Sequence, residues 1–304
     1  MPKKIKGKSS EACPAGVGFC RPSAEKTVGC LSVATSGGVD SMLLAHIFAY
    51  SLPSGQLTIA HFNHNLRPDS NQDEALVRDF AAKHSIRFVS KQANLADHSE
   101  ATARRARHEF LTSVTKTTIA TAHHLDDLCE TIAINLSRGT GWRGLAVLNR
   151  PNYIRPLLEL QKSEITSLAE EFKVQWREDS TNQSPKYLRN RLRPKIAALP
   201  FDTKWKLLKL QRRQAQIAQE INDLLQEYSS VLQGRNFYIF AKNEKSQIYE
   251  EALRFWLLQQ NIRSTRPEIK RLLNAIQTYQ PQKKFQLSSG RFILIRRHDF
   301  VILN

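Results

Sequence analysis

The stretch Leu31-Ser-Val-Ala-Thr-Ser-Gly-Gly-Val-Asp-Ser41 defines the first strand, loop and helix start of this 304-residue chain. Its first five residues form a run typical of a buried strand, and apolar residues recur at helical spacing after the glycine pair. Two adjacent glycines allow a tight turn in which an anion can approach backbone N–H groups, and the helix dipole favours the same anion. Ser36 and Ser41 add hydroxyl donors. The stretch therefore predicts a phosphate-binding loop, with a plain glycine turn and serine cap as the structural alternative.

Three further strand–helix units follow along the chain. Strands are predicted at 57–62, 87–90 and 118–122, and helices at 72–84, 101–115 and 125–137. Parallel neighbours need crossover helices, so four such units in series predict an α/β fold with a doubly wound parallel sheet, Rossmann-like in type. In such folds ligands bind beyond the carboxyl ends of the strands.

The pattern changes after Pro156. Helices are predicted at 160–173, 203–228, 246–260 and 267–279, a strand at 236–241, and a hairpin from Phe285 to Ile295 that turns at Ser289-Gly290. We therefore expect a flexible basic extension over 1–26 and a first domain over 27–205. A connecting helix then leads into a smaller mixed α/β domain over 206–304.

Positive charge is concentrated in one segment. The formal net charge is +17, and ten Lys or Arg residues lie between Lys186 and Arg213 with Asp202 as the single acid. A solvated helix face is the plain alternative, and a membrane surface is a weaker one because no clear apolar insertion face accompanies the charge. The balance favours nucleic acid as the partner.

The sequence contains no signal for a membrane span, a secretory signal or a metal site built on cysteines. No apolar run approaches the roughly 18 residues of a membrane span, and no apolar stretch follows the basic first residues. The four cysteines, at positions 13, 20, 30 and 129, form no CxxC pair and have no zinc-ligand spacing. We expect a soluble cytoplasmic chain with reduced thiols and no membrane contact. The oligomeric state stays open, with a homodimer allowed.

Several longer motifs stand at the ends of the predicted strands. In chain order they are His61-Phe-Asn-His-Asn-Leu-Arg-Pro-Asp-Ser70, Glu100-Ala-Thr-Ala-Arg-Arg-Ala-Arg107, Ala122-His-His-Leu-Asp-Asp-Leu-Cys-Glu-Thr131, Arg155-Pro-Leu-Leu158 with Lys162, and Trp176-Arg-Glu-Asp-Ser-Thr-Asn182 followed by Tyr187, Arg189, Asn190 and Arg193. Each alone has a plain reading as a structural histidine pair or a solvated helix face. Together, and in this order, they resemble the tRNA(Ile)-lysidine synthetases of the pyrophosphate-loop ATP pyrophosphatase superfamily, in their short form. The resemblance covers roughly residues 31 to 195, and His108 stands where that family usually has tyrosine.

The resemblance implies an activity. It points to an ATP-dependent ligase that converts the wobble cytidine of the CAU anticodon of isoleucine tRNA to lysidine. ATP adenylates the C2 oxygen and releases diphosphate, and the ε-amine of free L-lysine then displaces AMP. ATP, Mg²⁺, L-lysine and isoleucine tRNA are the implied ligands, with ATP binding and catalysis in 27–205 and tRNA binding in 206–304.

The same resemblance assigns roles to matching positions. The expected ATP-binding residues are Ser36, Gly37, Gly38, Val39, Asp40, Ser41, His61 and Arg67. The expected catalytic residues are Asp40, Arg104, Asp127 and Glu130, of which Asp127 and Glu130 also bind the lysine ammonium. The expected tRNA-binding residues are Arg107, Lys186, Arg189, Asn190, Arg191 and Arg193. Asp40 can hold Mg²⁺ or accept a proton, and the sequence leaves both roles open.

Two other functions stay open. A tRNA thiolase or another base-adenylating tRNA enzyme shares the loop, although many thiolases use the CxxC pair that this chain lacks. A non-catalytic RNA-binding relative would keep the fold but would be expected to lose the loop or Asp40, and both are intact.

Overall fold

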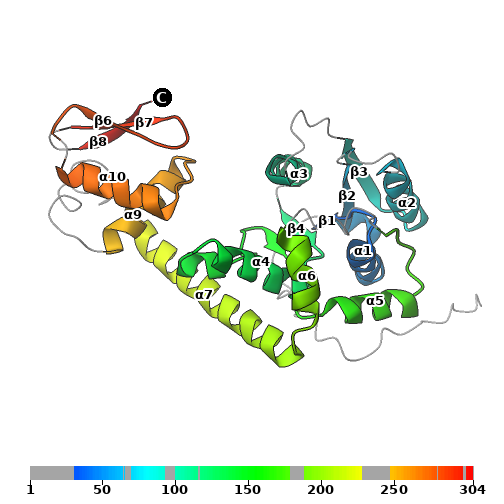
Figure 1. Cartoon of the computed structure of the whole chain (residues 1–304). Helices are drawn as coiled ribbons and strands as arrows, with labels where there is room; N and C mark the ends of the chain where they lie inside the picture. Colours follow the sequence, from blue (N-terminus) through cyan, green and yellow to red (C-terminus); the bar gives the residue numbers. More distant parts are fainter. Residues whose placement is uncertain are drawn as a thin grey trace, which may run out of the picture. The chain divides into compact units, whose positions relative to one another are not determined.

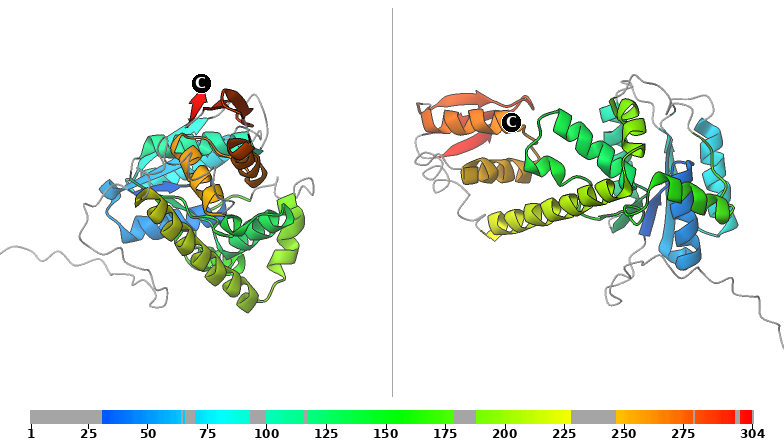
Figure 2. Two further views of the ribbon diagram at one scale, coloured as in Figure 1. Left: turned by 90° about the vertical axis from the view of Figure 1, so that its left-hand side faces the viewer. Right: turned by 60° about the horizontal axis from the view of Figure 1, so that its bottom comes forward.

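The computed structural model of the chain describes residues 31–63, 65, 70–92, 100–115, 117–178, 188–227, 247–278, 280–296 and 299–303. The chain divides into two compact units, one ending at Gln211 and the other beginning at Arg212. This division and the expected boundary after residue 205 both fall within one long helix, α7, Phe201–Glu227 (Figures 1 and 2). Each unit is described by itself.

A five-stranded parallel sheet with strand order β3-β2-β1-β4-β5 forms the centre of the first unit (Figure 1). The strands are β1 Leu31–Ala34, β2 Leu57–Asn63, β3 Arg87–Gln92, β4 Thr118–Thr121 and β5 Tyr153–Ile154. β1 is central, with Val33 in register with Ile59 on one side and Ala120 on the other. The doubly wound parallel sheet is confirmed, and β5 is an edge strand that was not predicted.

Helices connect and cover these strands. They are α1 Val39–Ser51, α2 Ser70–Lys83, α3 Glu100–Val114, α4 Leu125–Ser137, α5 Lys162–Glu171 and α6 Leu188–Ala197, with short 3-10 turns η1 Ser54–Gln56 and η2 Trp142–Leu145. The predicted helices from 72–84 to 125–137 are confirmed to within a few residues. α6 was not predicted as a helix, because its sequence was notable only for its positive charge.

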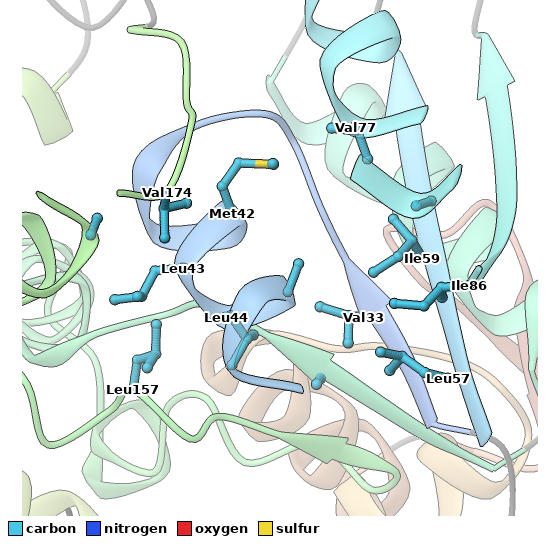
Figure 3. Close-up of a cluster of buried hydrophobic side chains, with 14 of the residues drawn as sticks. Val33, Met42, Leu43, Leu44, Leu57, Ile59, Val77, Ile86, Leu157 and Val174 are labelled. Atoms are coloured by element: carbon cyan, nitrogen blue, oxygen red, sulfur yellow. The ribbon is translucent and has the colours of Figure 1, made fainter. Parts of the chain in front are cut away.

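Apolar side chains fill both faces of the sheet. On one face, Met42, Leu43 and Leu44 of α1 belong to one buried cluster with strand residues such as Val33 and Ile59, and Leu43 points away from these strands toward Leu157 and Val174 (Figure 3). On the other face, Phe110 and Leu111 of α3 pack against β2 and β4. Burial on both faces explains why the central strands read as continuous apolar runs and not as an alternating pattern.

A buried ion pair ties the start of α7 to the rest of the first unit. The Lys204 Nζ lies 2.6 Å from Asp126 Oδ1 on α4 and 3.1 Å from Gln161 Oε1, just before α5. Lys204 is only 2% exposed. Removing two charges from water is costly, so the close pairing and the additional hydrogen bond are needed to offset it.

The second unit has its own core. α9 Gln247–Gln259 and α10 Arg266–Thr278 pack their apolar faces on an antiparallel sheet of β6 Lys283–Gln286, β7 Phe292–Ile295 and β8 Phe300–Leu303 (Figure 2). The hairpin is confirmed, with Gly290 in the left-handed region at φ +83°. The strand predicted at 236–241 lies outside the described residues.

None of the described helices combines the length and the apolar character that a bilayer-spanning helix needs.

Replacing Lys204 with methionine should lower the free energy of unfolding by about 3–5 kcal/mol, because Asp126 would keep a buried charge without its counterion. Urea denaturation measures the change. Lys206→Met on the same helix is the matched control, since its pair with Asp202 is about three-quarters exposed on both sides and should contribute no more than about 1 kcal/mol. Equal losses in the two variants would contradict a stabilising role for the buried pair.

Candidate active site

The loop between β1 and α1 is closed by its own serine hydroxyls. The Ser36 backbone N–H donates to Ser41 Oγ at 3.0 Å, and the two serine hydroxyls lie 3.1 Å apart. Ser41 Oγ in turn donates to the Gly38 carbonyl at 2.9 Å. Gly38 directly precedes α1, so Val39, Asp40 and Ser41 form the first helical turn, where backbone N–H groups lack intrahelical partners. The predicted loop residues are thus together, in a geometry suited to an anion.

Two segments that are distant in sequence brace this loop. Gly37 has φ +97°, which only glycine adopts easily, and a Cβ there would lie 3.2 Å from Asp73 Cβ on α2. The backbone N–H of Arg177 donates to the Gly37 carbonyl at 3.0 Å, and the Nε of the Arg177 side chain donates to Asp73 Oδ1 at 2.9 Å. The Asp73–Arg177 pair therefore supports the loop from outside.

A lysine reaches the carboxylate of the loop. Lys162 Nζ lies 2.5 Å from Asp40 Oδ1. The Lys162 backbone N–H donates to Asp126 Oδ2 at 2.8 Å, while the other oxygen of Asp126 is paired with Lys204. The first turn of α5 is thereby fixed beside the loop, and its ammonium is available to a phosphate.

His61 lies at the base of the loop. Its Nδ1 is 2.9 Å from the Thr35 carbonyl, so we assign the ring proton to Nδ1. Nε2 is buried and has no hydrogen-bond partner among the described atoms. Burial lowers the pKa of His61, although the Thr35 carbonyl opposes that shift. The ring is therefore neutral and leaves Nε2 as an acceptor. Arg67 falls outside the described residues.

Carboxylates line the first turns of α4, which follows β4. His124 begins the helix, and its N–H donates to Asp127 Oδ2 at 3.2 Å. Burial raises the pKa of Asp127, but His124 and His123 outweigh it and the net shift is downward. The Asp127 side chain is therefore ionised.

The predicted lysine-binding and tRNA-binding sets meet at Glu130. This carboxylate is 2% exposed, and the Nε atoms of Arg189 and Arg193 on α6 each lie 3.2 Å from one of its oxygens. Arg189 also donates to Thr131 Oγ1 at 3.0 Å. Burial and the charge of Asp127 raise the pKa of Glu130 against the pull of both arginines. Of the remaining predicted α6 residues, Asn190 is half-buried and Arg191 exposed, and Lys186 lies outside the described residues.

Arginines surround the neighbouring His123. Burial lowers its pKa to about 4; Asp127 opposes the shift, while Arg107, Arg155 and Arg104 add to it. Arg104 is exposed and Arg107 half-buried on α3. The predicted catalytic Arg104 and the predicted tRNA-binding Arg107 thus share one positively charged area beside β4.

Several residues of this site were not assigned roles from sequence. Asp73, Arg177, Lys162 and Lys204 act through contacts between distant segments, which a single sequence does not reveal. One signal was available: Asp73 stands four residues before Val77 on the buried face of α2, where an acid is unusual.

A family model for the PP-loop domain matches residues 18–199, more than half of the chain. The chain belongs to the PP-loop domain family. The loop at Ser36–Ser41, between the first strand and first helix, lies within the matched PP-loop region.

Three curated relatives of this PP-loop protein are named tRNA(Ile)-lysidine synthase. The tRNA(Ile)-lysidine synthase of Chlorobaculum tepidum is 40% identical over 180 residues, covering 54% of each chain. That of Thermotoga maritima is 29% identical over 282 residues, covering 86% of this chain and 67% of the relative. That of Nostoc sp. is 37% identical over 179 residues, covering 55% and 52%. The chain thus spans about half to two thirds of the length of these relatives.

Gly37→Ala should weaken ATP binding about tenfold and destabilise the fold by about 1–3 kcal/mol, because alanine is strained at this φ and its Cβ would press on Asp73. Calorimetric titration and thermal unfolding test both effects. Gly55→Ala is the control, since its Cβ would meet nothing within 4 Å. Wild-type ATP affinity in Gly37→Ala would contradict the importance of this loop conformation.

Proposed function

We propose that this chain is an ATP-dependent ligase that forms lysidine at the wobble cytidine of the CAU anticodon of isoleucine tRNA. The names of its relatives support this activity, and the arrangement of the candidate site supports its chemistry. The reaction needs a place for phosphates and a place for an ammonium close to one another.

One observation carries the proposal. The loop follows β1 and the carboxylates of α4 follow β4, and these two strands are hydrogen-bonded neighbours. The proposed anion site and cation site would therefore stand at the ends of adjacent strands, whose backbones lie about 5 Å apart. The wobble base would be adenylated between them, where ATP and lysine can both reach it.

The loop side serves adenylation. The first turn of α1, the two serine hydroxyls and Lys162 would hold the ATP phosphates, with His61 as a neutral acceptor nearby. Arg104 would stabilise the negative charge that develops at the α-phosphate as the C2 oxygen attacks and diphosphate leaves.

Asp40 would either hold Mg²⁺ or accept a proton. One or two carboxylates combined with substrate phosphates are a common Mg²⁺ arrangement, so a single aspartate beside the loop fits. When bound, Mg²⁺ would neutralise part of the triphosphate charge.

The α4 side serves the amine. Asp127 is half-buried and ionised, and it would receive the ε-ammonium of lysine. Glu130 would complete the site one turn further on, while also holding Arg189 and Arg193 in position. The lysine nitrogen, once deprotonated, would attack C2 and displace AMP.

The tRNA would be held mainly through phosphates. Arg191 is exposed on α6, Arg107 is half-buried on α3, and the second unit would add a further grip. Contacts of this kind give an affinity that falls steeply with salt.

A tRNA thiolase is the second candidate. Such an enzyme needs a reactive thiol, and burial raises the pKa of Cys129 to about 11, the opposite of an activated cysteine. The other three cysteines lie outside the described residues. Cys129 therefore does not suit the role of an activated thiol in a thiolase.

The deciding experiment combines purified protein, ATP·Mg²⁺, the CAU-anticodon isoleucine tRNA and labelled lysine. Mass spectrometry of the digested tRNA should show lysidine whose formation requires lysine, with one AMP released per modification. Folded protein that binds ATP and tRNA but yields neither product would exclude this function and favour the thiolase or a non-catalytic relative.

Asp40→Asn should reduce AMP release at least a hundredfold while tRNA affinity changes less than about twofold, because the lost carboxylate acts on ATP and not on RNA. Single-turnover assays and filter binding measure the two effects. The exposed Asp79→Asn serves as the control, with unchanged turnover expected. Near-normal turnover in Asp40→Asn would place the reaction elsewhere.

A further inference from the structure

A second group of polar side chains lies at the edge strand β5. Tyr153 opens this strand and pairs in register with Ile119 of β4. The His108 ring of α3 contacts the Tyr153 ring at 5.5 Å between centroids, and the Arg155 guanidinium carbon lies 5.7 Å from the same centroid. The tyrosine is thus held between α3 and the segment that follows β5.

Two donors in this group lack partners. Tyr153 Oη and Arg155 Nε are buried, and neither has a hydrogen-bond partner among the described protein atoms. Burial raises the pKa of Tyr153, so its hydroxyl stays protonated and can donate despite the arginines around it. Buried donors in native proteins are almost always satisfied, so these two point to a ligand.

The charges around these donors are positive. Burial lowers the pKa of Arg155 to about 10, with Arg150 and Arg104 adding to the shift. Burial and the charge of Arg104 also lower the pKa of Arg107. In the described site, Arg177 and Arg189 have carboxylate partners, Asp73 and Glu130, whereas the side chains that shift the pKa of Arg155 are Arg150, Arg104 and the neutral Tyr153. A dianionic or monoanionic oxygen ligand would relieve this repulsion.

We propose that Tyr153, Arg155 and Arg107 form a phosphate-binding site that takes a phosphodiester of the RNA substrate next to the base under modification. Guanidinium forks and a hydroxyl match phosphate oxygens. β4 separates β5 from β1, so the backbones of these two strands lie about 10 Å apart, and the proposed ATP site already has the donors of the loop. The assignment to RNA, as opposed to an ATP phosphate, rests on the proposed function.

Tyr153→Phe is the sharpest test, because it removes the hydroxyl and keeps the ring. We expect the affinity for a short anticodon stem-loop RNA to fall about five- to tenfold, with ATP affinity and thermal unfolding unchanged. Arg155→Gln should lower the slope of log Kd against log salt concentration by about 1. Arg105→Gln, an exposed neighbour on α3, is the charge-matched control and should change the slope by less than half as much.

The readouts separate the outcomes. Weaker ATP binding with normal RNA binding would overturn the RNA assignment and give the site to a nucleotide phosphate. Normal binding of both ligands by Tyr153→Phe and Arg155→Gln would overturn the site altogether, as would a wild-type protein that does not bind the stem-loop. Stem-loop binding needs no catalysis, so weakened binding in a protein that forms no lysidine would sustain the site while the proposed function fails.

Discussion

The carboxylate of Asp126 is the constraint on which the candidate site depends. Its two oxygens serve different segments: Oδ1 pairs with the buried Lys204 ammonium of α7, and Oδ2 accepts the backbone N–H of Lys162. One side chain of α4 therefore fixes the first turn of α5 and the first turn of α7 together. The backbone bond to Asp126 helps to hold Lys162 where its ammonium reaches Asp40. The loop chemistry of β1 is thus positioned by a residue that follows β4.

The arginines of the candidate site fall into two groups that differ in their partners. Arginines that support structure have carboxylates, as Arg177 has Asp73 and Arg193 has Glu130. The arginines beside β5 instead lie close enough to one another to lower each other's pKa, as Arg150 and Arg104 do for Arg155. A partly buried excess of one sign is unfavourable in a free protein, and it is tolerated where a ligand of the opposite sign completes it. Arginines with carboxylate partners thus support the fold, whereas the arginines beside β5 belong to the proposed phosphate site.

The sequence predicted the strands and helices better than the side-chain contacts between distant segments. The strand at 31–35 and the helices after it are strong local patterns, because apolar spacing reports burial directly. β5 has two residues and no such pattern, and α6 contains Pro194 and few apolar positions, so neither was predicted. Spacing placed Asp127 and Glu130 on one helix face, but it could not reveal that Arg189 and Arg193 lie opposite Glu130. Contacts between segments far apart along the chain, such as Asp73 with Arg177, leave little signal in a single sequence.

The ion pair between Asp40 and Lys162 joins the loop to the first turn of α5. Both side chains are partly exposed, and such pairs are worth only about 0–1 kcal/mol. Each charge can therefore exchange its partner at small cost, the lysine turning to a phosphate and the aspartate to a cation. A ligand carrying only one sign of charge can satisfy one half of the exchange, whereas a triphosphate with its metal satisfies both.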